Sequence, residues 1–123
     1  PLHATSSGKV LLAHAPDGVR ASVLAAPLPR YTPATITDAA VLTDALDKAK
    51  VDGWACTAEE YEVGLNAVAA PVRGADGSVI AAISVSCPAY RLVPESFPEV
   101  AERVRAAVND VSARMGFFDQ PVV

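Results

Sequence analysis

The clearest pattern in the chain is a pair of apolar runs separated by a short polar segment. Residues 67–73 and 78–87 are rich in Val, Ile and Ala, and Gly74-Ala-Asp-Gly77 lies between them. Asp-Gly is a strong hairpin signal, because glycine readily adopts the positive φ that a tight turn requires. The pattern therefore predicts two antiparallel strands joined by residues 74–77.

Side chains alternate between the two faces of a strand, so the second run has two distinct faces. One face is predicted to be core: Val79, Ala81, Ile83, Val85 and Cys87. The other face ends in two hydroxyls, Ser84 and Ser86. A buried hydroxyl needs a hydrogen-bond partner. This face therefore either meets water or bonds to neighbouring backbone, or it forms the floor of a pocket.

Two helices are predicted in the first 25 residues. The first begins with Ser6 or Ser7 as N-cap and ends before Pro16. Its apolar side chains are Val10, Leu11, His14 and Ala15. The N-terminus of this helix would offer unpaired N–H groups and a partial positive charge to a carboxylate, although a plain capped helix is the simpler interpretation. The second helix is capped by Asp17 and reaches about Ala25.

Two further helices and a short strand complete the prediction. A helix over 38–50 buries Val41, Leu42, Ala45, Leu46 and Ala49, and Trp54-Ala-Cys56 is a strand. The last helix begins at Ser96, which has the spacing of a capping box with Glu99, and it ends at Met115 before Gly116. Its predicted buried stripe is Val100, Val104, Val108, Val111 and Met115. This order predicts an α+β fold around an antiparallel sheet.

Composition and charge narrow the function. The 123 residues are 51% hydrophobic and 20% charged, as expected for one globular domain, and no apolar run is long enough to span a membrane. The net charge is −4 and no basic stripe is present, so we expect no nucleic-acid binding by this chain. Cys56 and Cys87 are interpreted as small buried residues in a reducing compartment.

Candidate chemistry is sparse. Glu59, Glu60 and Glu62 suggest carboxylate chemistry, but without converging partners we interpret them as a solvated loop or helical turn. A serine nucleophile with His3 or His14 is conceivable, but G-x-S-x-G, P-loop and G-x-G-x-x-G patterns are all absent. The two histidines are 11 positions apart, which is no metal-binding signature, and no cofactor is predicted.

Six stretches in order resemble the C-terminal effector-binding domain of the IclR family of bacterial transcriptional regulators. They are Leu2-His-Ala-Thr-Ser-Ser-Gly-Lys9 with Leu11-Leu-Ala13; Tyr31-Thr-Pro-Ala-Thr-Ile-Thr37; Gly53-Trp-Ala55; Glu59-Glu60 with Gly64-Leu65; Ala69-Ala-Pro-Val72; and Ala81-Ala-Ile-Ser-Val-Ser86. No single motif is decisive, and the specificity comes from their number and order over residues 1–116.

The resemblance implies a GAF-like or profilin-like domain, with an antiparallel sheet flanked by helices, that binds a small organic or aromatic acid. It implies a cytoplasmic homodimer or homotetramer that contacts DNA through a separate winged helix-turn-helix domain. Such domains normally have further N-terminal strands and a linker helix. We therefore expect residues 1–116 to be a truncated effector-binding domain and 117–123 to be a C-terminal tail.

The resemblance also implies a ligand site. Ser6 and Ser7 match the segment whose backbone amides hold the ligand carboxylate, Leu65 matches an apolar wall, and Ser84 and Ser86 match strand hydroxyls that bond the ligand. Three positions depart from the family pattern: Thr57 stands in place of Asp, Ala67 in place of Cys, and Asn66 in place of a frequent Arg. These changes imply a less acidic and roomier pocket.

Two alternative functions remain open at this point. Instead of sensing an effector, the domain could be a ligand-free structural or oligomerisation module of the same regulator. The second alternative, much less in keeping with the sequence, is a small hydrolase.

Overall fold

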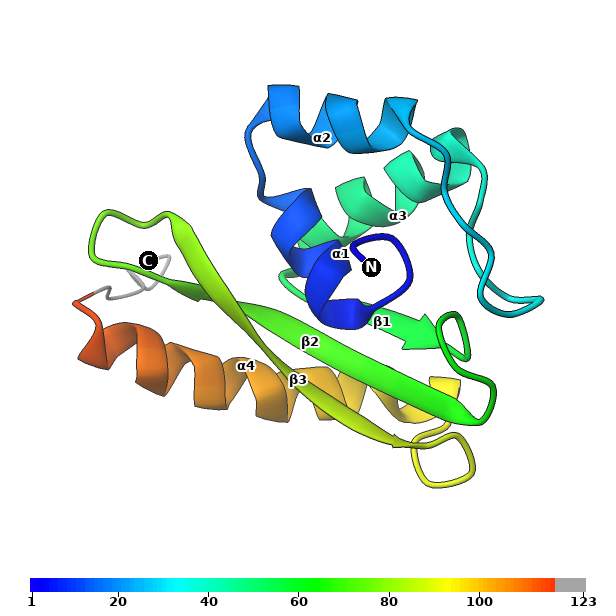
Figure 1. Ribbon diagram of the computed structural model, residues 1–123. Helices are drawn as coiled ribbons and strands as arrows, with labels where there is room; N and C mark the ends of the chain where they lie inside the picture. The colour runs from blue at the N-terminus through cyan, green and yellow to red at the C-terminus, as the bar shows by residue number, and fades with distance from the viewer. Residues whose placement is uncertain (117–123) are drawn as a thin grey trace.

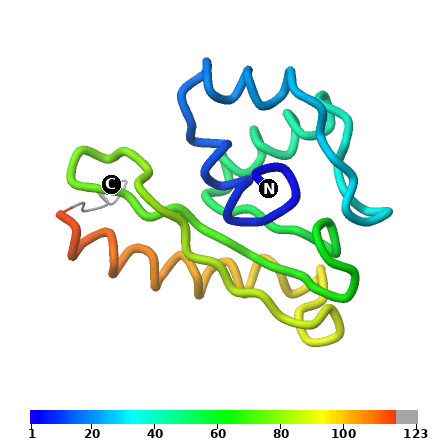
Figure 2. The backbone as a smooth tube through the Cα atoms, in the orientation of Figure 1, coloured from blue at the N-terminus to red at the C-terminus, as the bar shows by residue number. Residues whose placement is uncertain are grey.

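The computed structural model describes residues 1–116, and the tail predicted at 117–123 lies outside them. Its helices are α1 (Ser6–Ala13), α2 (Asp17–Ala25), α3 (Ala39–Asp52) and α4 (Phe97–Arg114), with a 3-10 turn, η1 (Pro94–Ser96), before α4. Its strands are β1 (Ala55–Ala58), β2 (Leu65–Arg73) and β3 (Val79–Pro88). Helices α1, α2 and α3 lie on one side of the sheet and α4 lies on the other, as Figure 1 and Figure 2 show. The predicted α+β class is confirmed.

The three strands form an antiparallel sheet in the order β1-β2-β3. The predicted hairpin is confirmed, and each of its strands differs from the prediction by one or two residues. Its turn is closed by a hydrogen bond from the Gly74 N–H to the Ser78 carbonyl at 2.9 Å, and Gly77 has a φ of 85°. The Ser78 hydroxyl and amide both donate to the Asp76 carboxylate, and these bonds lower the pKa of Asp76.

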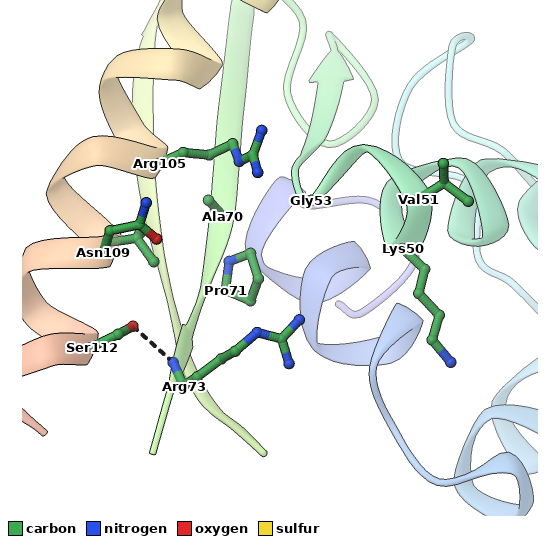
Figure 3. Close-up of a pocket in the computed structure, with 10 residues that line it drawn as sticks. Lys50, Val51, Gly53, Ala70, Pro71, Arg73, Arg105, Asn109 and Ser112 are labelled. Atoms are coloured by element: carbon green, nitrogen blue, oxygen red, sulfur yellow. Dashed lines mark hydrogen bonds between the residues drawn. The ribbon is translucent and has the colours of Figure 1, made fainter. Parts of the chain in front are cut away.

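Strand β1 is short and begins one residue later than predicted. It pairs with β2 only from Ala58 opposite Asn66 to Ala55 opposite Ala69. Among the described residues, β2 therefore runs four residues further with no strand on that side. Pro71 lies in this stretch, where the lack of a proline N–H breaks no ladder to β1. The Arg73 N–H instead donates to the Ser112 hydroxyl of α4 at 3.0 Å (Figure 3).

Successive residues of β2 face different helices. Val68, Ala70 and Val72 pack against residues of α4 or the turn before it, whereas Ala69 packs against α1 and α3. The register places Ser84 opposite Ala69, so the hydroxyl-bearing face of β3 is turned towards α1.

The predicted core face of β3 is wrong in part. Ile83 and Cys87 pack on the α4 side, but Ala81 is exposed and Val85 is 39% exposed. The cause is the position of β3 at the edge of the sheet, since α4 lies mainly along β2. Apolar side chains do alternate along β3, but among the described residues no helix covers Ala81 and Val85.

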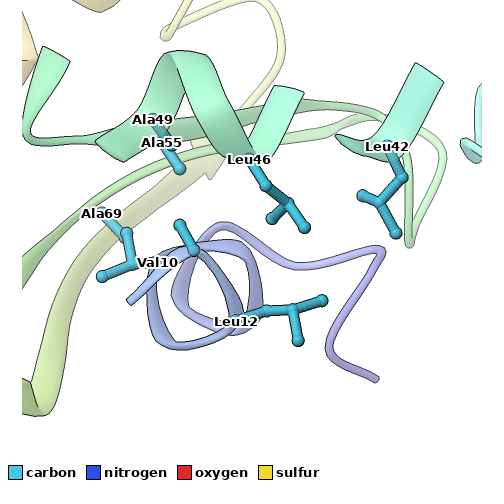
Figure 4. Packing of buried hydrophobic residues seen from close by; sticks show 8 residues of the cluster. Val10, Leu12, Leu42, Leu46, Ala49, Ala55 and Ala69 are labelled. Atoms are coloured by element: carbon cyan, nitrogen blue, oxygen red, sulfur yellow. The ribbon is translucent and has the colours of Figure 1, made fainter. Parts of the chain in front are cut away.

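The largest fully buried side chains meet between α1 and α3. Leu12 of α1 and Leu42 and Leu46 of α3 face one another there (Figure 4). The predicted stripe of α3 is confirmed at Leu42, Leu46 and Ala49, but Val41 is 52% exposed. In α1, the predicted member Leu11 is 38% exposed and Leu12 is buried instead. One position is about 100° on a helix. Helix α1 contacts both α3 and the sheet, so its buried face is turned by one residue towards Leu12.

Helix α4 shows a similar displacement. Its buried side chains are Phe97, Ala101, Val104, Val108 and Ser112, a helical spacing that begins at Phe97. The predicted members Val111 and Met115 are 36% and 52% exposed. Gly116, which directly follows the predicted end of this helix, has a φ of 95°, and Glu99 forms an exposed ion pair with Arg103 at 3.4 Å.

Two predicted caps are also wrong. Asp17 is the first residue of α2, whose N-cap is Pro16 and has no side-chain cap. Ser96 has helical backbone angles, and its hydroxyl donates back to the Val93 carbonyl at 2.9 Å. The chain enters α4 through the turn η1, so the capping box expected with Glu99 does not form.

Candidate ligand-binding site

The first turn of α1 begins one residue earlier than predicted. Its N-cap is Thr5, not Ser6 or Ser7, and the Thr5 Oγ1 accepts a hydrogen bond from the Gly8 N–H at 3.0 Å. Ser6 and Ser7 therefore occupy the first turn, where backbone N–H groups have no acceptor within the helix. These groups point out of the positive end of the helix dipole.

Gly8 allows the preceding segment to fold back over the start of α1. A Cβ on Gly8 would lie 2.6 Å from the Leu2 Cα and 2.6 Å from the Thr5 Oγ1. Backbone cannot move aside as a flexible side chain can, so this close approach requires glycine. It brings Ala4 and Thr5 over the same space that the helix terminus faces.

The sheet supplies a row of three side chains on the α1 face. Thr57 of β1 is paired with Ala67 of β2, and Ala67 is paired with Ser86 of β3. Ser84 lies two residues from Ser86, opposite Ala69, on the same face. The small Ala67 therefore lies between two hydroxyl-bearing side chains from the flanking strands.

A cavity of about 340 Å³ lies between this row and the start of α1. All seven residues named from the sequence line it: Ser6, Ser7, Thr57, Leu65, Ala67, Ser84 and Ser86. Among residues 1–116, those that sequence reasoning missed are Ala4, Thr5, Tyr61 and Glu62. The structure thus brings the predicted set together, while its role in binding a ligand stays a prediction.

The loop after β1 places Tyr61 and Glu62 at the cavity. Glu59 has a φ of 56°, and its carboxylate accepts from the Gly64 N–H at 2.8 Å. Thr32 and Thr35 donate to the carbonyls of Glu59 and Glu60, each at 2.6 Å. The Thr-rich connector therefore holds this loop, a long-range contact that no local pattern reveals.

Contacts between aromatic rings also join the Thr-rich connector to the loop after β1. Tyr31 meets Tyr61 edge to face with ring centroids 5.0 Å apart, and His3 lies 5.7 Å from Tyr31. The His3 Nε2 is 2.7 Å from the Pro29 carbonyl. His3 is thus engaged in packing the connector, and it is not a cavity residue.

The interpretation of the three glutamates as a solvated loop is wrong for Glu60. Its Oε1 lies 2.5 Å from the Lys9 Nζ, and the two side chains are 12% and 5% exposed. Lys9 also donates to the Cys56 carbonyl at 3.1 Å, and the Ala58 N–H donates to the Glu60 Oε2 at 3.0 Å. This buried ion pair joins α1 to the loop that carries Tyr61.

The cavity contains no cationic side chain among the described residues, and Glu62 is its one carboxylate. The N-terminus of α1 contributes a partial positive charge to one wall, equivalent to about half a charge. Thr57, Ser84 and Ser86 add hydroxyls that both donate and accept. The arrangement suits a small ligand with a carboxylate at the helix end and hydrogen-bonding groups along the sheet.

The remaining candidates lie elsewhere. His14 follows α1, away from the cavity residues, and Cys56 and Cys87 are free and half-buried. Burial raises the pKa of the Cys56 thiol. Within residues 1–116 there is no group of three His, Cys, Asp or Glu that could hold a metal ion. No helix in this range has the length and apolar content to cross a membrane.

Comparison with known proteins places these features in a family. The family profile described as the bacterial transcriptional regulator IclR C-terminal domain matches residues 1–113. The transcriptional repressor AllR of Klebsiella pneumoniae is 41% identical over 121 residues, which are 98% of this chain and 44% of AllR. The chain thus spans less than half the length of this relative.

Two solved structures with bound acids have the same fold. A double mutant of the inducer-binding domain of the transcription factor PobR from Acinetobacter, in complex with 3-hydroxybenzoic acid, gives a TM-score of 0.84 at 34% identity, covering 91% of this chain and 65% of that one. An IclR homologue from Microbacterium hydrocarbonoxydans, in complex with 4-hydroxybenzoate, gives a TM-score of 0.80 at 35% identity. The match covers 93% of this chain and 47% of the homologue. From its sequence profile and its fold, the chain belongs to the family of IclR C-terminal domains.

Proposed function

We propose that this chain is the effector-sensing domain of a transcriptional regulator and that its ligand is a small organic or aromatic acid. The observation that carries the proposal is the cavity in which the N-terminus of α1 faces Thr57, Ser84 and Ser86. The two relatives with bound hydroxybenzoates support the ligand class.

The cavity also sets the size and orientation of the ligand. A volume of about 340 Å³ is at the small end of ligand pockets, which suits an acid with one ring or fewer. The carboxylate would accept from the Ser6 and Ser7 amides, and the body would lie against Leu65 and Ala67. Glu62 and the strand hydroxyls would bond a polar group at the other end, such as a phenolic hydroxyl.

Ligand binding would act through population shift. An effector that binds one arrangement of a cytoplasmic homodimer or homotetramer more tightly than another changes the DNA affinity of a linked winged helix-turn-helix domain. AllR is named as a repressor, so release of DNA on ligand binding is one form of this response. We propose sensing of the acid rather than its chemical conversion, because the family profile and the relative AllR are described as transcriptional regulators.

Calorimetric titration with matched ligands tests the function. We expect 3- or 4-hydroxybenzoate to bind saturably and the neutral 4-hydroxybenzamide to bind at least about tenfold more weakly, because the amide lacks the charge that the helix terminus favours. Smaller 2-oxo acids extend the series. Failure of every acid to bind would favour a structural module, and turnover of a bound acid or ester would favour an enzyme.

A further inference from the structure

A second cavity, of about 220 Å³, lies at the far end of β2 between α3 and α4. It exists because β1 stops opposite Ala69, which leaves the last residues of β2 uncovered on that side. Its polar walls come from three elements: Lys50 of α3, Arg73 of β2, and Arg105, Asn109 and Ser112 of α4. In Figure 3, Arg105 and Arg73 lie on either side of Pro71; Arg105 extends towards Gly53 at the end of α3, and Arg73 extends towards α1.

The cavity collects positive charge in a chain whose net charge is −4. Of the ten Lys and Arg residues, five form ion pairs with carboxylates of residues 1–116: Lys9, Arg20, Lys48, Arg103 and Arg114. Three of the other five, Lys50, Arg73 and Arg105, line this one cavity. The cations that lack a carboxylate partner in the described chain are thus concentrated, although acidic residues outnumber basic ones.

Nearby backbone groups offset this charge only in part. The Arg105 guanidinium packs against Gly53, with three of its atoms 3.3 Å from the place where a Cβ would be. Gly53 ends α3, whose C-terminus is equivalent to about half a negative charge. The Arg73 guanidinium donates one hydrogen bond, to the Gly77 carbonyl at 2.9 Å. Three full positive charges therefore face about half a negative one.

Hydrogen-bond donors converge on the same space. The Ser112 hydroxyl is only 3% exposed, and its oxygen accepts from the Arg73 N–H. Its own hydrogen has no acceptor among the described residues. The Asn109 amide lies one turn away on α4 and also lines the cavity. The site thus combines charge with hydrogen-bond donors, which oxyanions require.

We propose that this cavity binds a small, doubly charged oxyanion, either phosphate or a dicarboxylate, between Arg73, Arg105 and Lys50. Guanidinium groups match the paired oxygens of both classes, and Lys50 adds a mobile point charge. The volume suits an ion of this size rather than a large metabolite. This site is separate from the cavity at α1, so it does not depend on the proposed effector function.

Titration of the ¹⁵N-labelled chain with inorganic phosphate tests the proposal. Sodium chloride is exchanged for phosphate at a constant ionic strength of about 0.15 M, so that general screening stays the same. We expect saturable shifts of the Gly53 amide and of the Arg73 and Arg105 Nε–H signals. A parallel titration with malonate compares the two ligand classes, and tighter binding of one ion assigns the class.

Charge-matched variants locate the site. Arg105→Gln should weaken phosphate binding about tenfold or more, and Lys50→Gln about fivefold. Arg103→Gln removes the same charge from the exposed face of α4 and should change affinity by less than about twofold. The proposal is overturned if shifts stay linear to about 20 mM of both anions, or if Arg103→Gln weakens binding as much as Arg105→Gln.

Discussion

The two ends of β2 carry two different kinds of cavity. At the end where β1 is present, the sheet is three strands wide, and a row of short side chains forms the floor of a hydroxyl-lined cavity that also contains the Glu62 carboxylate. At the other end, which β1 does not reach, the sheet is two strands wide. Long cationic side chains from α3, β2 and α4 line the cavity there. The short β1 thus leaves the two ends of β2 with differently lined cavities.

The two cavities also differ in how they attract an anion. The first relies on a helix terminus, a partial charge fixed by backbone geometry. The second relies on whole charges at the ends of flexible side chains. Folding therefore builds much of the first site into its backbone, whereas substitutions at the second should alter affinity with little effect on stability. The predictions below test this difference.

The largest expected effect comes from the ion pair that fixes the first end. The Glu60 side chain is only 12% exposed, and Lys9→Met removes its ion-pair partner. We expect a loss of about 3–5 kcal/mol in the free energy of unfolding, because a buried carboxylate is left without a compensating charge. Adding Glu60→Gln to Lys9→Met should recover much of this loss. Urea denaturation measures both variants.

Arg105→Gln is the matching variant at the second end. It should change the free energy of unfolding by no more than about 0.5 kcal/mol. Equal effects of Lys9→Met and Arg105→Gln would remove the distinction between a structural charge at the first end and a binding charge at the second.

The next effect concerns affinity. Ser84→Ala/Ser86→Ala removes two hydroxyls that each contribute about 0.5–1.5 kcal/mol to a neutral ligand group, or about 1.5–3 to a charged one. Affinity for the acid should fall between about tenfold and a few hundredfold. Folding should suffer less, because Ala82 already lies on the same face. Calorimetry with the acid identified by the ligand series checks this, and unchanged affinity in a folded variant would contradict the site.

A smaller effect is expected from the close approach at Gly8. Gly8→Ala places a methyl 2.6 Å from the Leu2 Cα and should cost about 1–3 kcal/mol of stability. Gly18→Ala is the control, because a Cβ there has nothing within 4 Å and Ala favours a helix by about 1 kcal/mol. Thermal unfolding of the two variants should therefore shift in opposite directions; a shared direction would mean that Leu2 moves away freely.

Local patterns predicted the elements of the fold, whereas most residues of the first site were implied by the resemblance to the IclR family. The Asp76-Gly77 turn and the alternation of β3 fixed the face on which Ser84 and Ser86 lie, and that face does line the cavity. The same alternation could not show that β3 is an edge strand, so Val85 was wrongly expected in the core. Edge position depends on which strands pair, and pairing is not a local property.

The missed residues share a physical cause. Tyr61 and Glu62 are positioned by Thr32 and Thr35, which are more than 20 residues away in sequence. Lys9 reaches Glu60 across a separation of 51 residues, about twice as long. The second cavity was missed for a different reason: Arg73 and Arg105 look like ordinary surface charges until the short β1 and the approach of α4 bring them together.

The smallest predicted effect is the titration of His14, which reports the charge at the second end of β2. Partial burial, followed by the positive charges of Arg73 and Lys50, lowers the pKa of His14 below its ordinary value of 6.5. Between the lowered pKa and 6.5 the unfolded chain therefore binds more protons than the folded one, so stability rises with pH through this window.

Lys50→Gln should raise the His14 pKa, and saturating phosphate should raise it further if the anion binds between Lys50 and Arg73. NMR titration of the His14 ring measures both changes. If the His14 pKa changes with neither Lys50→Gln nor phosphate, burial alone sets it. That result would remove the positive potential on which the contrast between the two ends of β2 rests.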